Sequence, residues 1–131
     1  MSLHKLTLCE LQKQFQAGEV TATEIVRAYF LRIGHVEPKV KAFVTQAKES
    51  AFMEAEVLDR KLKGWRKTQP LTGMPLAIKD NICTDGVSTT CSSRMLQNFV
   101  PPYDATVVAK VRAQEYILLG KTNLDEFAMG S

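Results

Sequence analysis

Two segments near the N-terminus repeat one pattern of polar and apolar positions. Segments 7–18 and 21–38 both open with Thr-x-x-Glu, the pattern of a capping box, in which each side chain bonds to the other residue's backbone N–H. The first has a stop signal at Gly18 and the second at Pro38. Apolar side chains share one helical face in each segment: Leu8, Leu11 and Phe15, then Ile25, Tyr29 and Ile33. We therefore predict two amphipathic helices.

The helical pattern continues, after one short interruption, to about residue 64. Residues 42–45, Ala-Phe-Val-Thr, favour an extended conformation because aromatic and β-branched residues suit strands. The next segment has an apolar face that ends near Gly64: Ala51, Ala55, Leu58 and Leu62. Residues 1–64 are thus predicted to be helical apart from that extended piece.

The pattern changes after Pro70. Residues 76–78 and 116–119 are short runs that are apolar on both faces, which is typical of strands buried in the middle of a sheet. Between them lie a Thr-, Ser- and Cys-rich loop over 82–93 and a helix that Asp104 is expected to cap. That helix has an apolar inner face: Val107, Val108 and Val111. We predict an α/β fold: N-terminal helices, then the first strands and loops (71–131) of a mixed, largely buried sheet that is incomplete in this chain.

Composition narrows the class of protein. With 131 residues the chain has room for one domain, and it has no apolar run of the roughly 18–20 residues that a membrane helix needs. The N-terminus lacks the apolar core of a signal peptide. Cys9, Cys83 and Cys91 match neither a disulfide framework nor a zinc motif, and only His4 and His35 offer imidazoles. We expect a protein of the reducing cytoplasm, without a metal, a cofactor or a histidine-based triad.

The net charge of +3 is too small to indicate a nucleic-acid-binding protein. Basic residues gather only around Trp65: Arg60, Lys61, Lys63, Arg66 and Lys67. This cluster has two interpretations, a contact with a phosphate backbone or a solvated helix end, and the second is the more common role of charge runs.

Lys79 is the strongest candidate for a catalytic residue. It follows an apolar strand, at the end where open α/β sheets place their sites. Burial of such a lysine would lower its pKa and let it act as a base near neutral pH. The alternative is a lysine that extends from the strand end into solvent. Asp80, Asn81 and the hydroxyl-rich loop favour the first interpretation, because a dense polar group beside an apolar strand needs partners.

Other candidates are weaker. Gly120-Lys121-Thr122 resembles the end of a phosphate-binding loop, but the motif requires glycine at the position of Glu115, and the residues between are a predicted strand. Ser92 and Ser93 have neither a nucleophile elbow nor a histidine nearby, so structural hydroxyls that cap a turn are favoured. Cys91 likewise lacks an activating partner and is expected to be a packed side chain.

Four stretches together resemble the amidase-signature family. Residues 71–81, with Gly-Met-Pro-Leu-Ala-Ile-Lys-Asp-Asn, are similar to its "GxPxxxKDN" strand, and residues 89–93 to the loop that follows it. Residues 120–131 begin with the "GKTN" of many amidases, and their "DEFAMGS" ending is characteristic of the A subunits of glutamyl-tRNA(Gln) amidotransferases. Residues 101–106 and the two capped helices also fit such subunits, so the resemblance covers essentially the whole chain and indicates the N-terminal portion, 1–131, of a single amidase domain.

The resemblance implies amide hydrolysis by a Ser–cis-Ser–Lys triad, with Lys79 as the lysine and glutamine as the substrate. The released ammonia would convert Glu-tRNA(Gln) to Gln-tRNA(Gln) on a B subunit that uses ATP and magnesium, while a small C subunit braces the A subunit. No glutamine-binding residue can be assigned from the resemblance. Both triad serines of the family fall in a Gly/Ser-rich segment beyond residue 131, so we expect this chain to be inactive alone.

Two further interpretations remain open. The chain could be the same portion of a stand-alone amidase, or a non-catalytic binding module with an amidase-like surface. One local departure from the family pattern is Gln114-Glu115-Tyr116, where the family usually has small residues and a glycine that ends the helix, so the local turn could differ from the family's. A left-handed backbone at this position would cost glutamate about 1 kcal/mol relative to glycine.

Overall fold

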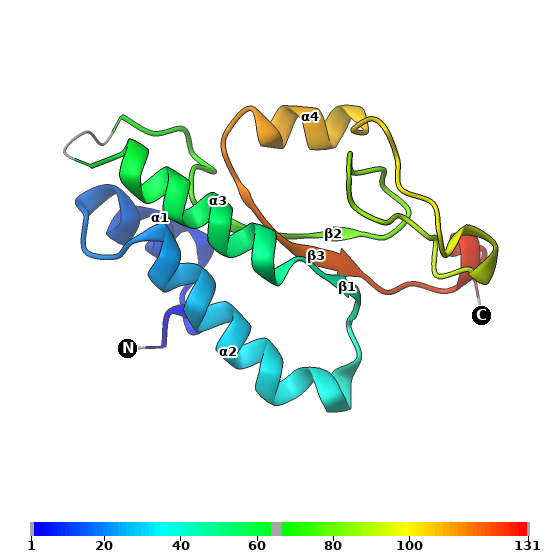
Figure 1. The fold of residues 1–131 in the computed structure, drawn as a ribbon. Coiled ribbons are helices and arrows are strands. Elements are labelled where there is room, and N and C mark those ends of the chain that lie inside the picture. The colour runs from blue at the N-terminus through cyan, green and yellow to red at the C-terminus, as the bar shows by residue number, and fades with distance from the viewer. Residues whose placement is uncertain (1, 64–66, 131) are drawn as a thin grey trace.

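The computed structural model describes residues 2–63 and 67–130. Four α-helices and three strands are the main elements of the described ranges (Figure 1). The helices are α1 (Leu8–Ala17), α2 (Ala22–Val40), α3 (Lys48–Lys61) and α4 (Thr106–Arg112). The strands are β1 (Phe43–Gln46), β2 (Pro75–Lys79) and β3 (Ile117–Thr122). Short 3-10 turns lie at Leu3–Lys5, Arg94–Leu96 and Glu126–Ala128. The predicted α/β fold class is confirmed.

The N-terminal helices begin as the sequence predicts. Both capping boxes form, and α1 ends at Gly18, whose φ of 76° is left-handed. Helix α2 continues two residues past the predicted stop at Pro38, because a proline in the last turn removes one backbone donor without preventing that turn from closing. Lys41, at φ 52°, then ends it. The predicted end of α3 at Gly64 lies outside the described residues, as do Trp65 and Arg66 of the basic cluster.

The three strands form one mixed sheet in the order β1-β3-β2. β3 is antiparallel to β1 and parallel to β2, and Lys79 stands opposite Thr122 at the ends of the parallel pair. The prediction that β3 lies inside the sheet is confirmed, since Ile117 to Lys121 are all buried. β2 differs from the prediction: within the described residues it pairs on one side only, and Ala77 and Lys79 are exposed.

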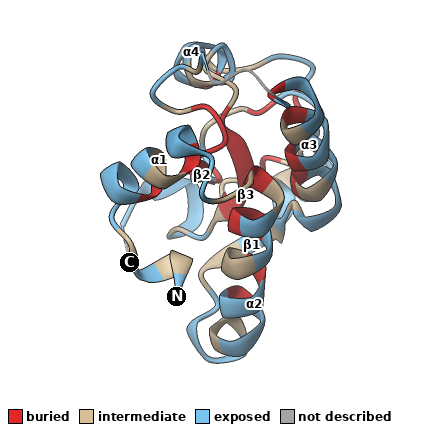
Figure 2. Cartoon of the chain, turned by 90° about the vertical axis from the view of Figure 1, so that its left-hand side faces the viewer, coloured by how far each residue is buried: buried red, intermediate tan, exposed pale blue. Residues whose placement is uncertain are grey.

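Two cores pack on the sheet's opposite faces. Helices α1 to α3 cover one face, where Phe15 and Ile25 belong to the same core as Ile117 of β3. Helix α4 lies over the other face, where Val108 belongs to the same core as Leu118 of β3 (Figures 1 and 2). In Figure 2 the buried residues concentrate in β3 and on the helix faces turned toward it. Among the described residues no helix is long and apolar enough to cross a membrane.

Two expectations near α4 have different outcomes. Asp104 does not cap this helix: the N-cap is Ala105 without a side-chain bond, and Asp104 instead accepts the Asp85 N–H (2.8 Å) and pairs with Arg112. Because the Asp104 carboxylate makes these two contacts, it does not cap the N-terminus of α4. Glu115 has a left-handed backbone, with φ 61°, so the chain adopts the left-handed turn here without a glycine, and the Glu115 carboxylate pairs with Lys61.

Candidate active site

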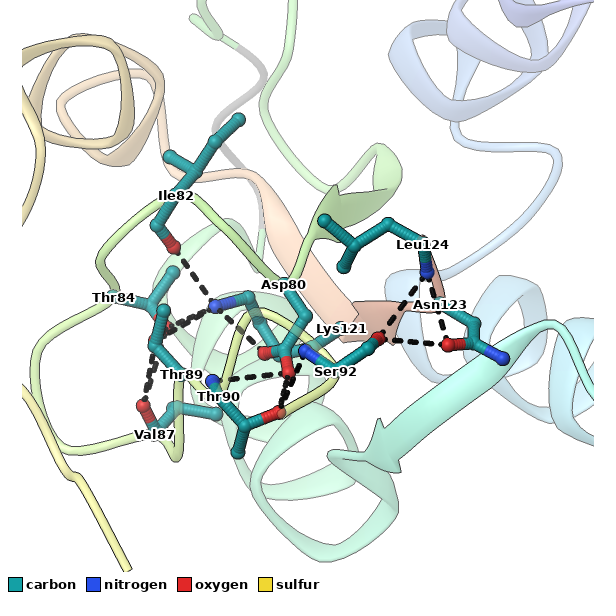
Figure 3. A network of polar contacts seen from close by, with 10 residues as sticks. All are labelled: Asp80, Ile82, Thr84, Val87, Thr89, Thr90, Ser92, Lys121, Asn123 and Leu124. Carbon is teal, nitrogen blue, oxygen red and sulfur yellow. Dashed lines mark hydrogen bonds and ion pairs between the residues drawn. The ribbon is translucent and has the colours of Figure 1, made fainter. Parts of the chain in front are cut away.

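The polar groups of the site gather where β2 and β3 end side by side. The strands are parallel, so their carboxyl ends meet at one edge of the sheet, where Asp80 continues from β2 and Asn123 from β3. The loop over 82–93 folds back to the same place, because the Cys91 N–H donates to the Asp80 carbonyl at 2.9 Å. Figure 3 shows the side chains that converge there.

Lys79 lies at the predicted strand end, with its side chain exposed rather than buried. Within the part of the chain that the structure describes, its ammonium has no hydrogen-bond or ion-pair partner. The side chain lines a small, mainly apolar hollow of about 140 Å³ between β2 and α4, together with Ile82 and Val107. Lys79 is therefore accessible for a further group to contact.

The buried lysine of this region is Lys121. From the sequence it is a candidate only within Gly120-Lys121-Thr122, which does not fit the phosphate-loop motif. Its side chain is 0% exposed, and its Nζ donates to Ile82 O (2.8 Å), Thr84 Oγ1 (3.1 Å) and Thr89 Oγ1 (2.9 Å) (Figure 3). Burial lowers the pKa of Lys121 below its ordinary value, and the nearby Asp80 carboxylate partly opposes that shift. Gly120 to Thr122 are strand residues, in agreement with the rejection of a phosphate loop.

A sequence signal for this buried lysine did exist. Lys121 comes two residues after the apolar run 116–119, and the threonine-rich loop offers hydroxyl groups that could satisfy an ammonium. Lys79 has the same signal, however, because it too follows an apolar strand. Only the packing of the loop over β3 distinguishes the two lysines.

Asp80 connects the strands and the loop. Its Oδ2 accepts the backbone N–H of Thr90 (3.1 Å) and the Thr90 hydroxyl, while its Oδ1 lies 3.5 Å from Lys121 Nζ. Both charged side chains are 0% exposed. Oδ1 has no hydrogen bond among the described residues, so the ion pair with Lys121 is its main compensation for burial.

The serines of the loop are already engaged. Ser93 accepts Met95 N–H and donates to Glu126 Oε1 at 2.7 Å, which confirms its predicted role as a turn cap. Ser92 donates to Asn123 Oδ1 at 2.8 Å and accepts Leu124 N–H (Figure 3). Within the described ranges neither hydroxyl bonds to a lysine or histidine, and both connect the loop to the segment after β3.

Several residues with a left-handed backbone lie where the loop over 82–93 contacts the segment after β3. Cys91 and Ser92 both have φ 52°, and Phe127 and Ala128 have φ 55° and 54°. The segments are joined directly, since Phe127 N–H donates to Cys91 O at 3.0 Å. Non-glycine residues in this conformation cost of order 1 kcal/mol or more each and persist only where the surroundings hold them. The rim of the site therefore contains strained backbone at the contact between the two segments.

A polar hollow of about 440 Å³ lies beside the loop. It is lined mostly by hydroxyl, amide and guanidinium groups: Thr45, Ser88, Thr90, Ser92, Ser93, Arg94, Gln97 and Asn123. Lys79 is not among its lining residues. The hollow could accept a small polar molecule, but nothing in its lining supplies an activated nucleophile. Among the described residues no group of His, Cys, Asp or Glu could hold a metal ion.

Comparison with known proteins identifies the class. The Amidase family model matches residues 24–131, so this chain belongs to the amidase family. It is 51% identical, over all 131 residues, to a protein of Desulforudis audaxviator named as the A subunit of glutamyl-tRNA(Gln) amidotransferase, and 52% identical to the protein of that name from Heliobacterium modesticaldum. In both comparisons the chain spans 27% of the relative's length.

Solved structures give the same fold. The peptide amidase of Stenotrophomonas maltophilia superposes with a TM-score of 0.86 at 35% identity, over 94% of this chain and 26% of that one. The glutamyl-tRNA(Gln) amidotransferase A subunit of Thermotoga maritima superposes with a TM-score of 0.74 at 34% identity, over 100% of this chain and 25% of that one. The described sheet and helices therefore correspond to about a quarter of an amidase chain.

Proposed function

We propose that this chain is the N-terminal portion of the amidase domain of a glutamine-hydrolysing amidotransferase subunit, and that Lys79 is the base of its triad. The observation that carries the proposal is the 51% identity, along all 131 residues, to the A subunit of a glutamyl-tRNA(Gln) amidotransferase. The ammonium of Lys79 is accessible at the end of β2 and has no partner among the residues that the structure describes, which supports the assigned role because a base must be free to contact the group that it deprotonates.

The chemistry would be a nucleophilic acyl transfer. A serine oxygen attacks the side-chain amide carbon of glutamine, and its proton passes through the hydroxyl of a second serine to the side-chain nitrogen of Lys79. The C–N bond then breaks, the nitrogen takes up a proton and leaves as ammonia, and water releases glutamate from the serine. Lys79 contributes the proton acceptor, and the triad's serines are contributed by the longer protein.

The partners follow from the same proposal. The ammonia would pass to a B subunit, which activates Glu-tRNA(Gln) with ATP and magnesium, and a C subunit would brace the A subunit. This chain itself would bind neither ATP nor the metal. Glutamine would be the substrate of this subunit, and Glu-tRNA(Gln) would bind to the assembled complex.

A chimaeric enzyme tests the role of Lys79. Residues 1–131 are joined to the remainder of the Desulforudis audaxviator protein, and the chimaera is assembled with that organism's other subunits. We expect Lys79→Ala to abolish glutamine hydrolysis, by several orders of magnitude in rate, while ammonia-dependent amidation of Glu-tRNA(Gln) continues. Lys110→Ala, on the exposed side of α4, is the matched control and should change neither activity. If Lys79→Ala kept more than about a tenth of the glutaminase activity, Lys79 would not be the base.

One observation favours a second candidate, a stand-alone amidase. The TM-score to the peptide amidase, 0.86, exceeds the 0.74 to the Thermotoga maritima protein. The two functions differ in substrate, so the chimaera is offered glutamine and an amidated peptide in parallel. Preference for the peptide amide, with no ammonia delivered to Glu-tRNA(Gln), would support the stand-alone amidase.

A further inference from the structure

Lys121 is a buried cation that the proposed reaction does not use. An ammonium has three N–H donors, and all three are occupied, by Ile82 O, Thr84 Oγ1 and Thr89 Oγ1. A lysine held in this way has no free donor and no access to solvent. Its geometry suits a tether between β3 and the loop over 82–93, and does not suit a proton carrier.

Asp80, which directly follows Lys79 in the chain, connects this tether to Lys79. The Asp80 N–H donates to Thr122 O (3.0 Å), its carbonyl accepts Cys91 N–H, and its carboxylate holds Thr90. The residue after Lys79 is therefore fixed on three sides, to β3 and to the loop. The Lys121 ammonium balances the charge of the Asp80 carboxylate, with Nζ 3.5 Å from Oδ1.

We propose that Lys121 and Asp80 form an internal clamp that positions Lys79 for catalysis, and that neither residue meets the substrate. The proposal rests on the proposed role of Lys79 as the base. The Lys79 ammonium has no partner among the described residues, so its placement depends on the backbone at the end of β2. The clamp fixes that backbone through buried contacts, which water does not weaken (Figure 3).

A displaced base affects the chemical step more than substrate binding. A misplacement of about 1 Å in a catalytic group commonly costs up to about 100-fold in rate. Substitutions in the clamp should therefore lower kcat for glutamine hydrolysis by roughly 10- to 100-fold. The KM for glutamine should stay within about threefold of the parent value, because the contacts that bind glutamine equally in the ground state and the transition state are not removed.

The test uses the chimaeric complex and two variants. The double variant Lys121→Met/Asp80→Asn removes both charges together, so that no unpaired charge is left buried. The single variant Asp80→Asn keeps an acceptor for Thr90 and removes only the carboxylate charge. Ammonia-dependent amidation of Glu-tRNA(Gln) reports whether each variant folds and assembles. Lys13→Met, on the exposed side of α1, controls for the loss of a lysine.

Each outcome decides the question. A selective fall in kcat, with ammonia-dependent amidation retained in at least one clamp variant, supports the clamp. Full glutaminase activity in both variants overturns it, and so does a rise in KM with kcat unchanged, which would place the pair in substrate binding. If both variants lose both activities together, the pair serves folding alone and the proposal fails.

The Lys79→Ala variant separates this test from that of the proposed function. If Lys79→Ala remains active, the role of Lys79 is wrong whatever the clamp variants do. If Lys79→Ala is inactive and the clamp variants are fully active, only the clamp is wrong.

Discussion

Gly120 of β3 lies against the backbone of β1, and it gives the sharpest stability prediction for this chain. A Cβ at this position would lie 2.8 Å from Phe43 Cδ1 and 3.1 Å from Gln46 Cα, and closer still to Thr45 O. Carbon atoms pack best at about 3.5–4.0 Å, so β1 would have to shift by several tenths of an ångström. Two of the three obstacles are backbone atoms, which cannot rotate away as a side chain can.

The magnitude follows from two opposing effects. Overpacking a well-packed site commonly costs about 1–3 kcal/mol. Alanine regains about 0.5–1 kcal/mol over glycine in a strand, because glycine loses more conformational freedom on folding. The backbone obstacles place the steric cost at the upper end, so we expect Gly120→Ala to reduce the free energy of unfolding by about 1–2 kcal/mol.

Gly34→Ala is the matched control. Gly34 lies in α2, and no atom of the described residues comes within 4 Å of an added Cβ, so the same substitution should stabilise the chain by about 0.5–1 kcal/mol. Urea unfolding of the 131-residue chain, followed by circular dichroism and by fluorescence, measures both. The two midpoints should move in opposite directions. A midpoint for Gly120→Ala at or above that of the parent would refute the reasoning about the β1–β3 contact.

The remaining predictions concern charged residues. The pKa of Asp104 is held below its ordinary 3.8, chiefly by the hydrogen bond from Arg112 and further by the Asp85 N–H, although partial burial opposes the shift. Its stabilising contribution is therefore complete above about pH 3.8 and is lost as the pH falls through the lower folded-state pKa. In an acid-unfolding series the difference in stability between the parent and Asp104→Asn should shrink over that window, and a difference independent of pH would contradict this. At the left-handed position 115, Glu115→Gly should be more stable than Glu115→Ala by about 1 kcal/mol, although both lose the exposed pair with Lys61. Equal urea midpoints for these two variants would show that the backbone at 115 relaxes.

The elements of this fold were predictable because their signals are local. The two capping boxes, the apolar faces of α1 to α3 and the apolar run of β3 each depend on residues a few positions apart. The boundaries were less certain where two local effects compete, as at Pro38, where the helix continues to Val40. The left-handed backbone of Glu115 was not predicted, because the sequence has glutamate at a position where only glycine adopts that conformation without strain.

The site was only partly predictable, because it depends on contacts between distant segments. The sequence placed Lys79 at the end of an apolar strand, and the resemblance to amidases selected it as a candidate base. The sequence could not decide which lysine is buried, since Lys79 and Lys121 both lie at or near the end of an apolar strand. That difference arises only when the threonine-rich loop folds over β3, so that Ile82, Thr84 and Thr89 surround one ammonium and leave the other exposed. Asp104 shows the same limit: its local sequence predicts a cap, but Arg112 and the backbone of Asp85 compete for its carboxylate in the folded chain. Local spacing thus determined the elements and the position of Lys79, whereas the burial, partners and charge environment of the site were decided by tertiary packing.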